Sequence, residues 1–132
     1  MTAEELLERY AAGERDFSGV DLSGVDRSSG IELSGANLTN INFSGANLTF
    51  AMFWNARLVS ANFRGANLNY VDFEGADLTN ARFQSSYLTC TIFHSANLTN
   101  ADFTDSEGVW LYKDAVFENT TMSKGDIRTR HQ

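Results

Sequence analysis

Few residues of this 132-residue chain have the types and spacing that covalent chemistry needs. His94 and His131 are isolated in the sequence, and Cys90, the single cysteine, has no evident base to activate it. No set of side chains has the spacing of zinc ligands, and no glycine-rich loop opens a helix to bind phosphate. We therefore expect a protein that is not an enzyme and that uses no metal, no cofactor and no small-molecule substrate.

Binding through outward aromatic and apolar side chains has better candidates. Aromatic residues and methionine are enriched where proteins associate, and a monomer seldom leaves a cluster of them in water. The candidate interface for another protein, or for a second copy of this chain, consists of Phe50, Met52, Trp54, Tyr70, Ile92, Trp110 and Tyr112. These residues are far apart in the sequence, so they depend on elements that bring them together.

A five-residue repeat runs through the chain from Leu33 to Phe103. A large apolar residue stands at every fifth position, and from Leu38 onward leucine and phenylalanine alternate. The residue two positions earlier is small, and it is alanine in ten of fourteen cases. These two columns are the expected core.

The period of five excludes a long helix and a long flat strand. On a helix, five residues turn the side-chain direction by roughly 140°, and on a strand an odd spacing sends successive side chains to opposite faces. The chain must instead bend every five residues and wind into stacked coils about 4.8 Å apart. Because leucine and phenylalanine alternate, an even number of pentads per coil stacks leucine on leucine and phenylalanine on phenylalanine. We expect four pentads, or twenty residues, per coil.

The order Ala, then Asn or Asp, then Leu and two variable residues recurs at 46–50, 66–70, 76–80 and 96–100. These pentads resemble those of the pentapeptide-repeat family, which are written A(D/N)LXX. The resemblance implies an all-β solenoid, a right-handed quadrilateral β-helix over roughly residues 15–127, in a bacterial protein. Fold does not by itself imply function.

Residues 2–12 are predicted to form a short helix that precedes the coils. Thr2 can cap its N-terminus, and its apolar side would cover the open end of the first coil. The five-residue spacing breaks near 26–30 and again near 105–113, where we expect loops. The whole chain is predicted to be a single domain.

The spacing resumes after the second break. Phe117, Met122 and Ile127 are five residues apart and are predicted to form the last coil, and residues 128–132 are predicted to be a polar tail. Along the repeat, an asparagine precedes several of the leucines. Hydrogen-bonded ladders between coils are expected at Asn37, Asn47, Asn67 and Asn97.

At twenty residues per coil, the candidate interface residues gather on and beside the side centred on Phe73. Two interpretations stay open. The residues form a contact surface for a homodimer or for a different protein. Alternatively, Trp110 and Tyr112 fold back from the 105–113 loop over Phe50 and Trp54 as local cover.

The net charge of −7 raises another hypothesis. Some members of the pentapeptide-repeat family imitate DNA and bind the topoisomerase DNA gyrase, so a DNA mimic is the alternative function. The charge distribution is uneven: residues 1–32 carry eight acids and three bases, 33–103 carry four and three, and 104–132 carry five and four. Because the acids lie toward one end and not along the repeat, a protein-interaction or scaffold module is the main prediction. The sequence contains no basic stripe, so direct nucleic-acid binding is not expected.

Localisation follows from what the sequence does not contain. No apolar run approaches the length of a membrane span or a secretory leader, and one cysteine cannot form an internal disulfide. We expect a cytoplasmic protein that does not bind membranes.

Overall fold

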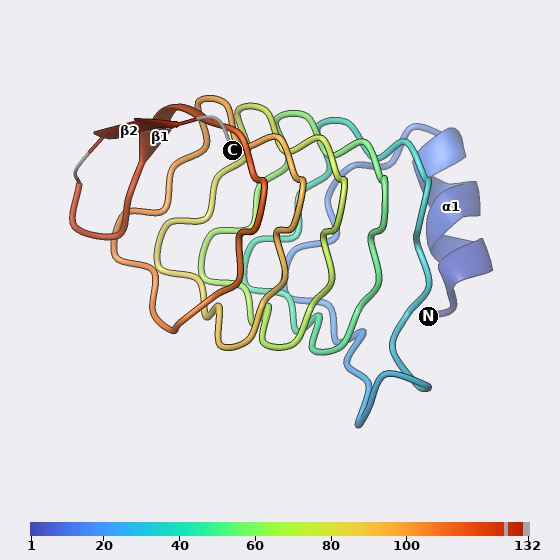
Figure 1. Ribbon diagram of the computed structural model, residues 1–132. Coiled ribbons are helices and arrows are strands. Elements are labelled where there is room, and N and C mark those ends of the chain that lie inside the picture. The colour runs from blue at the N-terminus through green and yellow to red at the C-terminus, as the bar shows by residue number, and fades with distance from the viewer. Residues whose placement is uncertain (126, 131–132) are drawn as a thin grey trace.

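The computed structural model describes residues 1–125 and 127–130. The chain winds into a stack of coils, a β-helix, with a helix at its N-terminal end and a two-stranded sheet at its C-terminal end (Figure 1). Its elements in chain order are α1 (Ala3–Ala11), β1 (Phe117–Thr121) and β2 (Ile127–Arg130). Between α1 and β1, single parallel β-bridges join the five-residue segments of neighbouring coils.

The bridges define the length of a coil. Over most of the stack, bridged residues are twenty positions apart, as for Met52 with Asp72 and for Asp72 with Ile92. Turns recur every five residues between the bridges, so each of these coils contains four five-residue segments. The prediction of twenty residues per coil is therefore confirmed.

The pentad 77–81 shows how the repeat satisfies its own backbone. Leu78 and Asn80 donate their N–H groups to the following coil, and Asp77 donates to the preceding coil. The N–H of Ala81 closes the turn on the Leu78 carbonyl at 3.0 Å. The fifth N–H, from Thr79, donates to the Asp77 carboxylate at 3.1 Å. All five donors are paired, which explains why Asn or Asp so often precedes the leucine.

The asparagines before the leucines bond within their own coil. Asn47 accepts hydrogen bonds from the N–H and the hydroxyl of Thr49 at 3.2 and 2.7 Å. Side-chain oxygens also accept the N–H two residues further on at Asn37, Asn67 and Asn97. The predicted ladders between coils are therefore wrong, because each corner turn presents a nearby backbone donor that these side chains satisfy first.

Phenylalanine rings form two files inside the coils. The centroids of Phe53 and Phe73 lie 5.3 Å apart and those of Phe73 and Phe93 lie 5.2 Å apart, with nearly parallel planes. The two files meet edge to face, as for Phe73 and Phe83 at 82°. All the Leu and Phe centres of the repeat from 33–103 are 1% exposed or less. The core predicted from the alternation is confirmed.

Helix α1 covers the N-terminal end of the stack and is one residue shorter at each end than predicted. Thr2 caps it by accepting the N–H of Glu5 at 3.1 Å. Leu6 is fully buried, and Tyr10 donates its hydroxyl to the Thr39 carbonyl at 2.7 Å. Within the described residues, neither α1 nor any other helix is long and apolar enough to cross a membrane.

The first coil is longer than those that follow. Asp16 bridges Asn42 and Asp21 bridges Asn47, so bridged positions are here twenty-six residues apart. The six extra residues fall in the irregular stretch 24–30, at the predicted first break.

The second predicted break is a shortening by one residue. Tyr87 bridges Glu107 at a spacing of twenty, but Ile92 bridges Leu111 at a spacing of nineteen. One position of the repeat is therefore missing between Glu107 and Leu111.

The C-terminal end is a hairpin and not a last coil. Strand β1 continues the stack, because its last residue, Thr121, bridges Asp102. After Met122, Gly125 adopts a φ of +84°, and β2 then pairs with β1 in the antiparallel direction. The prediction that Ile127 continues the pentads is wrong, because the chain has already reversed.

The predicted polar tail is also wrong in part. Strand β2 runs to Arg130, so residues 128–130 belong to the hairpin. His131 and Gln132 lie outside the described residues, as does Asp126.

Candidate functional site

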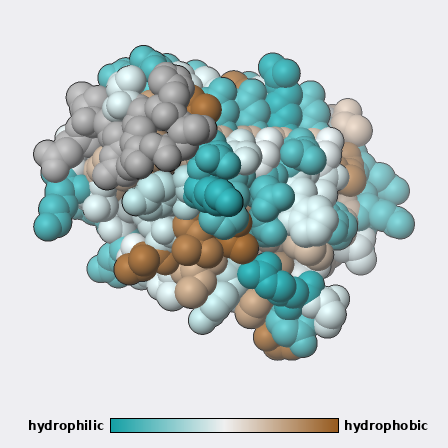
Figure 2. All heavy atoms as spheres, in the orientation of Figure 1, coloured by the Kyte–Doolittle hydropathy of each residue, from teal (hydrophilic) through white to brown (hydrophobic). Residues whose placement is uncertain are grey.

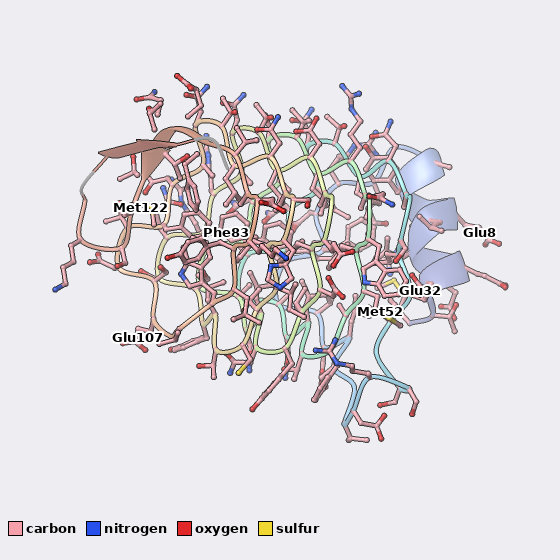
Figure 3. All side chains as sticks on the ribbon, in the orientation of Figure 1. Glu8, Glu32, Met52, Phe83, Glu107 and Met122 are labelled. Carbon is pink, nitrogen blue, oxygen red and sulfur yellow. The ribbon has the colours of Figure 1, made fainter. Side chains whose placement is uncertain are left out.

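The candidate interface lies mainly on one side of the β-helix, which faces the reader in Figure 2. Hydrophobic side chains gather there, and hydrophilic ones surround them. The bridges align one central column over five coils, formed by Glu32, Met52, Asp72, Ile92 and Leu111. The first two of these lie side by side near α1 in Figure 3. We define the aromatic face as Phe50, Met52, Trp54, Tyr70, Ile92 and Leu111.

Phe50 and Tyr70 form a stacked pair at the same corner of successive coils. Their ring centroids are 4.9 Å apart and their planes differ by 12°. Phe50 is half-buried, and Tyr70 is 39% exposed. Both have positive φ, 66° and 62°, a conformation that other corners give to residues such as Gly35 and Asn80. The turn itself therefore does not require an aromatic side chain.

Trp54 is an exposed ring held by a buried acid. Its indole N–H donates to the Asp72 carboxylate at 2.5 Å, and the other oxygen of Asp72 accepts the Glu74 N–H at 2.9 Å. Asp72 is 7% exposed, whereas Trp54 is 49% exposed. The carboxylate thus fixes the orientation of the exposed indole, and a side chain that is already fixed loses less entropy in any contact it makes.

Met52 and Ile92 lie half-buried in the central column, as the twenty-residue winding predicts. Leu111, 47% exposed, extends the column by one coil. The sequence analysis missed Leu111, because the missing repeat position shifts it into this column. It also missed Tyr87 and Val109, which are 48% and 82% exposed. Both precede, in later coils, the corner that Phe50 and Tyr70 occupy in theirs.

Trp110 does not belong to the aromatic face. Its ring stacks on Phe103 at 4.7 Å and 20° and meets the Phe93 ring edge to face at 4.9 Å. The residue is half-buried against the core. Its predicted outward position is wrong, because the shortened coil directs the indole inward at the C-terminal end of the phenylalanine files.

Tyr112 lies next to Trp110 and is 40% exposed. Its ring contacts those of Trp110 and Phe117 at 5.5 and 5.6 Å. Trp110 and Tyr112, together with His94, Leu111, Lys113 and Asp114, line a pocket of about 290 Å³. This pocket adjoins the C-terminal end of the aromatic face.

The 105–113 loop does not fold back over Phe50 and Trp54. Three coil steps separate Met52 from Leu111 in the central column. Trp110 and Tyr112 lie near Leu111, at the far end of that column. Trp54 accordingly keeps half of its surface in solvent.

The described residues offer little for catalysis or metal binding. The Nδ1 atom of His94 accepts the backbone N–H of Lys113 at 2.9 Å, and Cys90 is an exposed free thiol. Among the residues that the structure describes, no group of three or more His, Cys, Asp or Glu side chains could hold a metal ion.

Three exposed carboxyls with shifted pKa values lie in the first coil and its loop. Hydrogen bonds from the hydroxyls of Ser18 and Ser23 hold the pKa values of Asp16 and Asp21 below the usual range. Ser28 lowers the pKa of Asp26 in the same way. Each carboxylate accepts hydrogen bonds from the residue two positions later, so these turns explain the lowered pKa values.

Comparison with known families agrees with this geometry. A model of pentapeptide repeats matches residues 29–65 and 66–105, with eight copies. The chain belongs to the pentapeptide-repeat family. The matched ranges coincide with the regular coils and include five of the six aromatic-face residues, all except Leu111.

Solved structures of other pentapeptide-repeat proteins are similar to this chain. HetL, involved in heterocyst differentiation regulation in the cyanobacterium Nostoc sp. strain PCC 7120, is 18% identical with a TM-score of 0.41, and the match covers 97% of this chain and 100% of HetL. The protein alr5209 of Nostoc PCC 7120 is 27% identical with a TM-score of 0.47, covering 86% and 87% of the two chains.

A trypsin-treated form of QnrB1, a plasmid-mediated fluoroquinolone resistance protein, is 22% identical with a TM-score of 0.50. That match covers 82% of this chain and 53% of QnrB1. This likeness supports a shared β-helix fold and nothing further. No curated protein matches the chain.

Proposed function

We propose that this pentapeptide-repeat protein is a non-enzymatic interaction or scaffold module that binds a partner protein through its aromatic face. The observation that carries the proposal is the Trp54 indole, half exposed and fixed in place by the buried Asp72 carboxylate. A rigid, partly exposed tryptophan amid apolar neighbours has the character of an interface hot spot.

The aromatic face is distinct from the rest of the surface. Two segments away along each coil, the corresponding outward positions include Asn62, Arg64 and Arg82 and no aromatic residue. Solubility alone would be served by such polar residues on every side. The gathering of aromatic and aliphatic residues on one side therefore favours a dedicated contact surface.

Further features of the molecule belong to the same proposal. We take the four segments of each coil as the sides of a right-handed quadrilateral, as in the family resemblance, and the chain as one domain of a bacterial cytoplasmic protein. No observation on the aromatic face favours the alternative of a DNA mimic that binds gyrase.

The experiment is affinity capture from cells that make the protein, with wild type compared with Trp54→Ala/Tyr70→Ala. We expect the double variant to recover a partner at least about tenfold less well, because removal of central interface aromatics typically costs 2 kcal/mol or more. Sedimentation of the purified proteins tells whether the partner is a second copy.

The matched control is Arg64→Ala/Arg82→Ala, which changes two side chains on the polar side. It should recover the partner as wild type does. Equal capture by wild type and Trp54→Ala/Tyr70→Ala, with unchanged sedimentation, would reject the aromatic face as the binding surface.

A further inference from the structure

We propose that the occupant of the aromatic face is a cationic amphipathic α-helix of the partner protein, about thirteen residues long and parallel to the coil axis. The inference rests on the proposed function and adds the chemistry and shape of the partner. Three properties of the aromatic face carry it: its charge, its spacing and its saturated backbone.

The charge around the aromatic face is negative. The outward positions of this side and its two corners hold one base, Lys113, and four acids: Glu32, Asp72, Glu74 and Asp114. With histidine neutral, this side carries −3, and it stays negative even if Arg27 of the adjoining loop is counted. An apolar strip with carboxylates within it and beside it is complementary to an apolar stripe flanked by lysine or arginine.

The spacing of the coils matches a helix better than an extended strand. Side chains of the central column repeat at each coil, about every 4.8 Å. Successive turns of a helix present side chains about every 5.4 Å, whereas a strand presents one face about every 6.6 Å. Five coils span about 19 Å between the first and last column residues, the length of about thirteen helical residues.

The backbone of this side offers nothing to an added strand. Met52 and Asp72 each donate their N–H to the preceding coil, and the carbonyl of each accepts an N–H from that same coil, from Leu33 and Phe53. Trp54 donates its N–H to the Ser34 hydroxyl at 3.1 Å. Because these groups are already paired, a partner must bind through side chains, which is how an amphipathic helix docks.

The ends of the aromatic face give the docked helix a direction. Glu32 lies at one end of the central column, whereas Lys113 and Asp114, whose charges offset each other, lie beside the other end. A helix carries partial positive charge at its N-terminus and partial negative charge at its C-terminus. The N-terminus should therefore lie toward Glu32, and an apolar residue of the last turn would enter the pocket of about 290 Å³ beside Tyr112.

A second copy of this chain fits less well. Its only helix within the described residues, α1, carries Glu4, Glu5 and Glu8 against Arg9 and is itself acidic. Two negative surfaces would repel each other. The occupant is therefore a different protein.

The test uses a synthetic fourteen-residue amphipathic peptide of leucine and lysine, labelled with a fluorophore, and a matched peptide with glutamate in place of lysine. Fluorescence anisotropy measures binding to the purified full chain at 50 and 300 mM salt. We expect the lysine peptide to bind, more weakly at high salt, and the glutamate peptide to bind at least about tenfold more weakly.

Two variants locate the binding. Glu74→Lys should weaken binding about tenfold, and Trp54→Ala by at least as much. Glu8→Lys is the control, because it makes the same change in net charge outside the aromatic face, on the outer side of α1 (Figure 3). It should stay within about twofold of wild type.

The proposal is overturned if no lysine peptide binds, if both peptides bind equally, or if Glu74→Lys and Glu8→Lys behave alike. Self-association that depends on Trp54, without peptide binding, would also reject a helix as the occupant of the aromatic face. The proposed function would then stay intact. Partner capture unaffected by Trp54→Ala/Tyr70→Ala would instead reject the proposed function itself.

Discussion

At the scale of single residues, the pentad needs only four things. It needs a large inward side chain, a small inward side chain, an acceptor for the turn N–H, and a corner residue that tolerates positive φ. Tyr70 and Phe50 occupy corners where glycine or asparagine would be less strained. Trp54 fills an outward position for which the fold sets no requirement. Side chains that the fold does not need are the ones to assign to function.

Replacing Tyr70 with asparagine separates a role in the stability of the fold from a role in partner binding. Tyr70→Asn relieves strain of about 1 kcal/mol at positive φ and loses a ring stack of about 0.5–1.5 kcal/mol. The free energy of unfolding in urea should therefore change by less than about 1 kcal/mol, while partner capture falls.

The control for this substitution lies in the same coil. Phe73→Ala removes a ring that is fully buried and should cost about 3–5 kcal/mol. A loss of more than about 2 kcal/mol in Tyr70→Asn would show that the exposed stack is structural.

At the scale of elements, the shortened coil after Glu107 is the main irregularity of the stack. Gly108 lies over Leu88, where a large inward residue is due, and has a φ of +110°. The Trp110 indole supplies the missing apolar volume by stacking on Phe103. A glycine and a tryptophan thus replace the leucine and the small residue of a regular pentad.

This account predicts a large effect of Gly108→Ala. A Cβ atom there would lie 2.6 Å from the Thr89 backbone nitrogen, at a φ unfavourable for alanine. The free energy of unfolding should fall by about 2 kcal/mol or more.

Gly65→Ala is the matched control, because Gly65 has a φ of +65° and nothing within 4 Å of an added Cβ. Its cost should be near 1 kcal/mol, from backbone strain alone. Similar losses in the two variants, measured by urea unfolding, would show that close packing at Gly108 does not matter.

The regular coils could be predicted from sequence because each pentad repeats the same physical requirements. The alternation of Leu and Phe gave the coil length, and Thr2 marked the start of α1. The hairpin could not be predicted, because Phe117, Met122 and Ile127 keep the five-residue spacing although the chain turns back at Gly125. Spacing reports the periodicity of side chains and not the direction of the backbone.

The site was predictable to the extent that it rests on regular coils. Phe50 and Tyr70 are one coil length apart, Met52 and Ile92 are two coil lengths apart, and Trp54 is two residues from Met52, so all five lie on one side. After Glu107 one position of the repeat is missing, which shifts the register of the following residues. Trp110 therefore turns inward and Leu111 joins the central column. Nothing in the letters between 107 and 111 marks which position is skipped.

At the scale of the whole molecule, the stack is a rod with unlike sides. One side carries the aromatic face together with four acids, and the side two segments away is polar. Most of the remaining acidity belongs to α1 and the first coil, at one end of the rod. A DNA mimic would need its acids distributed along the length, so the charge pattern agrees better with a lateral contact through one side.

The central claim is that a partner covers the aromatic face, and hydroxyl-radical footprinting of the captured complex tests it directly. We expect oxidation of Met52, Trp54 and Tyr70 to fall several-fold on complex formation, because the partner excludes water from them. Leu7 on α1, 38% exposed in the free protein, should be oxidised equally in both states. Unchanged oxidation of Trp54 and Tyr70 in the complex would contradict the account.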